Sequence, residues 1–130
     1  MINRILVVDD EPASLESIRR GLLMSGFKNI RTVSDPREAL ALLERGGSFD
    51  VALLDIRMPF IDGLELLDIF KKVSPTTKCI MMSALHESEI VKTALEKGAF
   101  AYLTKPFGKE TLVSLVNRAL TTGDVLNLLT

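Results

Sequence analysis

The chain alternates five times between a short apolar segment and a longer amphipathic one, and this alternation constrains the fold most. The short segments are rich in Ile, Leu, Val and Met, which is typical of buried strands. The longer segments carry apolar residues at helical spacing, as Leu15, Ile18 and Leu22 do. Strands that alternate with helices predict an α/β domain with a parallel sheet. We expect strands at residues 5–8, 29–33, 51–54, 79–82 and 101–104.

The polarity of the strand segments predicts their order in the sheet. The segments that end at Asp9, Asp55 and Ser83 are continuously apolar, as expected of strands covered by helices on both faces. Residues 29–33 alternate between polar and apolar, which favours a sheet edge. We therefore predict a doubly wound, five-stranded parallel sheet of order 2-1-3-4-5 with five helices. In that order the ends of strands 1 and 3 lie side by side at the topological switch point.

Four of the strands end in polar residues of a narrow chemical range. These residues are Asp9 and Asp10, Asp55, Ser83 and Lys105. The carboxyl ends of parallel strands lie along one edge of the sheet, where such folds bind ligands. The sequence therefore predicts one small pocket with carboxylates, a hydroxyl and an ammonium, suited to a divalent cation and a phosphoryl group.

Three ionised carboxylates in one pocket repel each other strongly. At about 4–5 Å and an effective dielectric near 20, each pair costs roughly 3–4 kcal/mol. We therefore expect a cation, and Mg²⁺ fits because it prefers oxygen ligands. The alternative is that Asp10 or Glu11 merely caps the helix that begins near Pro12, which explains one acid but not the set.

With a cation in place, Asp55 can act as a nucleophile toward phosphorus, since phosphoryl transfer needs positioning and charge neutralisation. The metal, Lys105 and the Ser83 hydroxyl would each take one phosphoryl oxygen. The Lys105-Pro106 bond is either cis or trans, and a cis bond would direct Lys105 toward Asp55.

Composition excludes several other classes of function. A formal net charge of −1 gives no bulk attraction to nucleic acid or to an anionic membrane. No apolar run approaches the roughly 20 residues that span a bilayer, and no signal-peptide segment is present, so we expect a cytoplasmic protein. Cys79, inside an apolar strand, is expected to be a buried hydrophobe, and His86 lacks the partners that a metal site of its own would need.

Several short motifs stand in order at these strand ends. They are Asp9-Asp10, Asp55-Ile56-Arg57-Met58-Pro59 followed by Asp62-Gly63, Ser83-Ala84, and Lys105-Pro106-Phe107. Together, over residues 3–121, they resemble a response-regulator receiver domain of two-component signalling. The resemblance implies a CheY-like, flavodoxin-like fold and a regulatory domain rather than an enzyme. It implies that Asp55 accepts a phosphoryl group from a histidine kinase, with the domain assisting its own phosphorylation and dephosphorylation.

The resemblance also assigns roles to individual residues. Asp10, Asp55 and the carbonyl of Arg57 would bind Mg²⁺ directly, and Asp9 would act through water. Lys105 would bind the phosphate.

For the conformational switch, the resemblance makes Ser83 the switch hydroxyl and Tyr102 the switch aromatic. The simpler alternative for Tyr102 is packing alone.

Three other readings compete with a phosphoacceptor. A magnesium-dependent phosphatase resembling haloacid dehalogenases would need an Asp-x-Asp motif, but position 57 is Arg, and no cap domain fits in 130 residues. A flavodoxin-type electron carrier would need a hydroxyl- and glycine-rich phosphate loop in place of the acids after the first strand. A degenerate receiver that acts only as a binding module would not need every pocket residue.

We divide the chain into a receiver domain, residues 1–121, and a C-terminal tail, residues 122–130. The apolar spacing of the last helix continues into the tail through Leu112, Leu115, Ala119, Thr122, Leu126 and Leu129. This 3-4-3-4-3 spacing is that of a two-stranded coiled coil. The tail is therefore either a frayed end or the start of a helical linker to an output domain, with homodimerisation through the seam. The expected partners are a histidine kinase and an output domain or effector protein.

Overall fold

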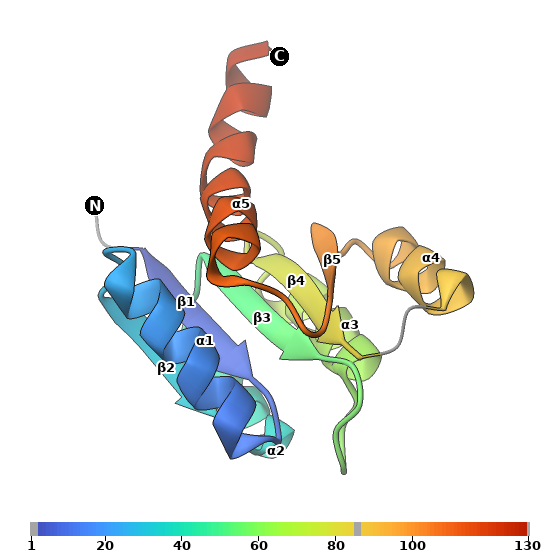
Figure 1. The fold of residues 1–130 in the computed structure, drawn as a ribbon. Coiled ribbons are helices and arrows are strands. Elements are labelled where there is room, and N and C mark those ends of the chain that lie inside the picture. Colours follow the sequence, from blue (N-terminus) through green and yellow to red (C-terminus); the bar gives the residue numbers. More distant parts are fainter. Residues whose placement is uncertain (1–2, 85–86, 130) are drawn as a thin grey trace.

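The computed structural model describes residues 3–84 and 87–129, with side chains described as far as residue 122. His86 therefore lies outside the described residues. The strands are β1 (Arg4–Val8), β2 (Asn29–Val33), β3 (Val51–Asp55), β4 (Lys78–Ser83) and β5 (Ala101–Thr104). The helices are α1 (Pro12–Met24), α2 (Pro36–Glu44), α3 (Gly63–Val73), α4 (Ser88–Glu96) and α5 (Lys109–Leu129). Strands and helices alternate along the chain, as the sequence predicts (Figure 1).

The five strands form one parallel sheet in the order β2-β1-β3-β4-β5, which confirms the predicted topology. All five residues of β3 are buried, whereas β2 alternates between exposed and partly buried positions until Val33. Since β2 lies at the sheet edge, its polar positions reach solvent without the desolvation that a central strand would impose.

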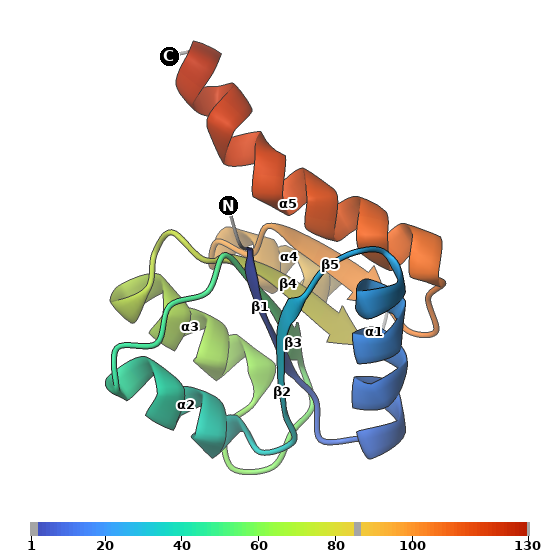
Figure 2. The same ribbon diagram turned by 90° about the vertical axis from the view of Figure 1, so that its left-hand side faces the viewer.

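Helices cover both faces of the sheet (Figure 2). On one face, α1 and α5 pack against alternate residues of the central strands, including Ile5, Val7 and Leu53. On the other face, α2, α3 and α4 pack against the intervening residues, including Leu6 and Leu54. Cys79 belongs to this second core, and burial raises the pKa of its thiol to about 12, so the predicted role as a buried hydrophobe is confirmed.

The start of α3 fixes the loop that follows β3. Asp62 accepts a hydrogen bond from the Glu65 backbone N–H at 2.8 Å, and the Glu65 side chain accepts one from the Asp62 N–H, so the two residues form a capping box. Between them, Gly63 approaches the end of β3 so closely that an added Cβ would overlap the Asp55 carbonyl oxygen and lie 2.8 Å from Ile56 Cα. Only glycine fits there, so this residue sets how near α3 starts to the end of β3.

The last helix extends well beyond the sheet. α5 has 21 residues, a length of about 31 Å at the usual helical rise, and its C-terminal part projects from the rest of the domain (Figures 1 and 2). Residues 122–129 continue this helix. The side chains of Leu126 and Leu129 in the predicted seam lie outside the described residues. Among the described residues, no helix is long and apolar enough to cross a membrane.

Candidate functional site

The predicted polar residues converge at the carboxyl edge of the sheet. Asp55 ends β3, Asp9 directly follows β1 and Lys105 directly follows β5, while Ser83 ends β4. In the sheet register Val8 lies opposite Leu54, so the residues after β1 and at the end of β3 are neighbours. Parallel pairing has thus brought together side chains that are far apart in the sequence.

Asp9 is fully buried and has both carboxylate oxygens occupied. Its Oδ1 accepts a hydrogen bond from the Glu11 backbone N–H at 3.0 Å, and its Oδ2 accepts one from Lys105 Nζ at 2.7 Å. A buried carboxylate requires such partners because desolvation otherwise penalises the charged form. The contact with Lys105 therefore neutralises the innermost acid of the pocket.

Lys105 is the cation around which the acids are arranged. Besides Asp9, its Nζ lies 3.7 Å from Asp55 Oδ1 and 3.7 Å from Glu11 Oε1. Burial by itself lowers the pKa of Lys105, but Asp9, Asp55 and Glu11 together outweigh it and hold the pKa above its ordinary value. The Lys105 backbone N–H donates to the Ser83 carbonyl at 2.8 Å, and the Lys105-Pro106 bond is cis, which decides the alternative that the sequence leaves open.

The carboxyl of Asp55 has a strongly raised pKa. Only 5% of the Asp55 residue is exposed to solvent. Burial, together with the negative charges of Asp9 and Asp10, raises the pKa of Asp55 to about 7, although Lys105 opposes this rise. A carboxyl with such a pKa is poorly solvated when charged, and a compensating cation would favour its ionised form.

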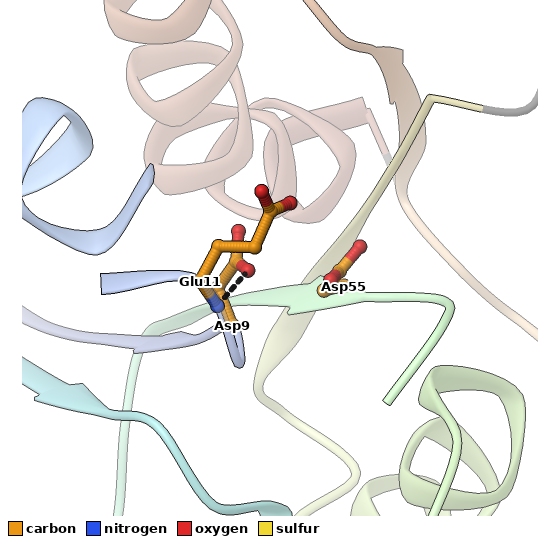
Figure 3. A group of neighbouring side chains, drawn as sticks. All are labelled: Asp9, Glu11 and Asp55. Carbon is orange, nitrogen blue, oxygen red and sulfur yellow. Dashed lines mark hydrogen bonds between the residues drawn. The ribbon is translucent and has the colours of Figure 1, made fainter. Parts of the chain in front are cut away.

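Three carboxylates could hold a cation together. Oxygens of Asp9, Glu11 and Asp55 all lie within 4.8 Å of one another, and Figure 3 shows the three side chains gathered at the strand ends. Hard oxygen donors at this separation suit a divalent ion such as Mg²⁺. The residues present therefore fit a metal site.

Sequence reasoning missed Glu11 as a member of this cluster. Glu11 stands at the N-cap position of α1 but makes no side-chain capping bond, so the capping alternative is wrong for this residue. The available signal was the run of three consecutive acids after β1, of which one cap explains only one.

Asp10 and Arg57 lie beside the cluster. Both are exposed and line a cleft of about 510 Å³ between the β3–α3 loop and α4, together with Ile56, Met58, Pro59, Asp62 and Ile90. Asp10 is near enough for its charge to raise the pKa of Asp55. Of the predicted metal ligands other than Asp55, Asp9 therefore lies buried beside Lys105. Asp10 and Arg57 lie exposed at the cleft.

Ser83 and Tyr102 lie on the same face of the sheet. Ser83 is 2% exposed and pairs in register with Thr104, while Tyr102 pairs with Met81 two residues earlier. Side chains alternate between the two faces along a strand, so Ser83 and Met81 of β4 and Tyr102 of β5 face the same core, which α2, α3 and α4 cover. Tyr102 packs against this core. The two predicted switch residues therefore lie on the same face of neighbouring strands, two register positions apart.

Comparisons with known proteins agree with this geometry. The family model described as the response regulator receiver domain matches residues 5–117. The Regulatory protein AtoC of Escherichia coli (strain K12) is 39% identical over 119 residues, which are 92% of this chain and 25% of that protein. The DNA-binding transcriptional regulator NtrC of Salmonella typhimurium is 38% identical over 116 residues, 89% of this chain and 24% of that protein. The chain thus spans about a quarter of the length of these two relatives.

Solved structures show the same fold over nearly the whole chain. A CheY-like response regulator receiver domain protein from Methanospirillum hungatei JF-1 superposes with a TM-score of 0.88 at 32% identity, covering 95% of this chain and 98% of that one. The BeF3-activated DrrB receiver domain superposes with a TM-score of 0.83 at 32% identity, covering 92% and 98%.

Proposed function

The chain belongs to the response-regulator receiver family of two-component signalling, and from that premise we propose that Asp55 is its phosphoacceptor. The observation that carries this assignment is the environment of Asp55. Its carboxyl lies buried at the end of β3, 3.7 Å from Lys105 Nζ, with its pKa raised to about 7. Phosphoryl transfer to such a carboxylate is favourable because its negative charge is spread over the phosphoryl oxygens, where a neighbouring cation stabilises it.

The donor is a histidine kinase that carries a phosphohistidine. One carboxylate oxygen of Asp55 attacks the phosphorus, a P–O bond forms, and the P–N bond breaks with its electron pair returning to the imidazole nitrogen. Lys105 stands close enough to take up charge on one phosphoryl oxygen, and the Ser83 hydroxyl lies on the neighbouring strand to meet another. The protein thus assists its own phosphorylation and, through the same groups, the later attack of water.

Asp9, Asp10, Asp55 and the carbonyl of Arg57 are the residues that would hold Mg²⁺. Their oxygen donors and the closeness of the Asp9 and Asp55 carboxylates support this set. When bound, the ion supplies positive charge that offsets the repulsion among the acids and the transferred group. Glu11 is an additional acid of the same pocket.

Labelling with a small phosphodonor tests the assignment. Acetyl phosphate with Mg²⁺ should add one phosphoryl group, detected by intact-mass spectrometry, and the Asp55→Asn variant should show none. Asp50→Asn is the matched control because Asp50 is exposed at the opposite end of β3. Labelling of Asp55→Asn equal to that of the parent, or labelling that persists in a chelator, would contradict the proposal.

Phosphorylation would act through Ser83 and Tyr102. Movement of the Ser83 hydroxyl toward a phosphoryl group frees space on the face where Tyr102 packs, which changes the surface formed by α4, β5 and α5. The shared face of the sheet supports this coupling. The ligand shifts the equilibrium because it binds one of the two packings better.

The output of the signal lies in a partner. AtoC and NtrC are regulators about four times the length of this chain, which supports an output domain or effector protein as the recipient. A net charge of −1 gives this domain no electrostatic attraction to nucleic acid or an anionic membrane. Because several relatives are named as transcriptional regulators, we place the protein in the cytoplasm.

We also propose that residues 122–130 begin a helical linker and that its seam forms a homodimer. The continuation of α5 to Leu129 and the heptad spacing support this. Sedimentation should show stronger association for the full chain than for a chain that ends at Leu120, with the difference increasing when beryllofluoride and Mg²⁺ are added. Equal association of the two chains under both conditions would contradict the linker dimer.

A further inference from the structure

Lys105 is held by three carboxylates, one of which has no part in the proposed phosphoryl transfer. Among the described residues its acidic contacts are Asp9 at 2.7 Å, Asp55 at 3.7 Å and Glu11 at 3.7 Å. Asp9 and Glu11 both follow β1, whereas Asp55 ends β3. The ammonium thus lies between two acids on one side of the pocket and the acceptor on the other.

The backbone around Glu11 directs its side chain toward this pocket. The residue has an extended conformation (φ −96°, ψ 112°), makes no side-chain cap on α1 and is followed by Pro12 at the start of the helix. Its N–H donates to Asp9 Oδ1, which ties it to the innermost acid. Figure 3 shows its side chain lying over Asp9, with the carboxylate on the same side of the strand ends as that of Asp55. The carboxylate therefore reaches Lys105 from the solvent side.

We propose that Glu11 is a positioning residue that retains the Lys105 ammonium on the β1 side of the pocket and opposes its transfer to a phosphoryl group on Asp55. This inference rests on the proposed function of Asp55. A bound cation would neutralise Asp9 and weaken its hold on Lys105. Glu11 is then the acid that still contacts Lys105 on that side. Its ion pair helps set the equilibrium between two positions of the Lys105 ammonium, one near Asp9 in the unphosphorylated protein and one near the phosphoryl group on Asp55.

A simpler effect of charge must be separated from this role. Any acid near the pocket repels an incoming anion, whether or not it touches Lys105. Glu11→Gln removes the charge and keeps the length of the side chain. Glu11→Asp keeps the charge but withdraws the carboxylate by one methylene, which breaks a contact already at 3.7 Å. Positioning predicts that both variants behave alike, whereas simple repulsion predicts an effect of Glu11→Gln alone.

The measurement is the affinity for beryllofluoride, a phosphoryl analogue, at saturating Mg²⁺, followed by ¹⁹F NMR. Glu11 is 69% exposed in its side chain, and exposed ion pairs are weak, so we expect both variants to bind beryllofluoride about three- to fivefold more tightly than the parent. In the Lys105→Met background, substitution of Glu11 should change the affinity no further, because the partner through which Glu11 acts is gone. The NMR signal of Lys105 Cε should also shift in both single variants without any ligand.

Other outcomes would refute either the positioning role of Glu11 or the proposed function of Asp55. Tighter binding in Glu11→Gln with parental affinity in Glu11→Asp would show simple repulsion and refute positioning. Tightening that persists in the Lys105→Met background would also refute it. A parent protein with no magnesium-dependent binding, or equal binding by Asp55→Asn, would refute the proposed function itself, and the role of Glu11 with it.

Discussion

The raised pKa of Asp55 predicts that this carboxylate destabilises the metal-free protein. An ordinary Asp has a pKa of 3.8, whereas that of Asp55 lies at about 7 in the folded chain. Between these values the folded state holds a proton that the unfolded state has lost. The contribution of Asp55 to stability is therefore fully present below about pH 4 and is lost as the pH rises through about 7. Asp55→Asn should remove this loss.

The magnitude follows from the charges around Asp55. At an effective dielectric near 20, Lys105 at 3.7 Å attracts Asp55 by about 4 kcal/mol, and an acid within 4.8 Å repels it by roughly 3–4 kcal/mol. These nearly cancel, which leaves burial as the main cause of the shift. A rise from 3.8 to about 7 corresponds to a ceiling of about 4 kcal/mol. Because the charge of Asp9 contributes to the shift and ionisation of either acid affects the other, we expect about half of this ceiling, roughly 2 kcal/mol at pH 8.

The assays are urea unfolding and thermal unfolding, each followed by circular dichroism, since the chain has no Trp. At about pH 8, Asp55→Asn should be more stable than the parent by about 2 kcal/mol, a rise in Tm of about 6 °C, and at about pH 4 the two should be nearly equal. Mg²⁺ should stabilise the parent at the higher pH and Asp55→Asn much less. Asp50→Asn, at the other end of β3, should show no such pH-dependent gain. A parent more stable than Asp55→Asn at pH 8, or a difference independent of pH, would refute the reasoning.

Two further predictions concern the loop after β3 and the switch. Gly63→Ala should destabilise the fold by about 3 kcal/mol or more, because the added Cβ would overlap the Asp55 carbonyl oxygen. The control Gly108→Ala has no atom within 4 Å of the added Cβ and should change the free energy of unfolding by less than about 1 kcal/mol. Equal unfolding curves for the two variants would contradict this prediction. Ser83→Ala should still accept one phosphoryl group by mass spectrometry yet show smaller NMR shifts in α4 and β5 on activation, and shifts equal to those of the parent would exclude the hydroxyl as the coupling element.

The sequence by itself determined the fold and most of the site. Continuous apolar strands and the alternating segment at residues 29–33 predicted the strand order. A strand covered by helices on both faces is apolar throughout, whereas an edge strand keeps polar residues at its exposed positions. Polar residues directly after apolar strands predicted the pocket, because the carboxyl ends of parallel strands must share one edge. Asp9, Asp55 and Lys105 meet there as a consequence of topology.

Only the tertiary structure decided how the side chains share the pocket. Lys105 is hydrogen-bonded to Asp9 rather than to Asp55, and the Lys105-Pro106 bond is cis rather than trans. Glu11 turns into the pocket although its position at the start of α1 favours a cap. A sequence pattern specifies which residues reach the strand ends. Their directions and partners depend on differences of about 1 kcal/mol among competing hydrogen bonds and ion pairs, and these differences are set by packing around the finished site.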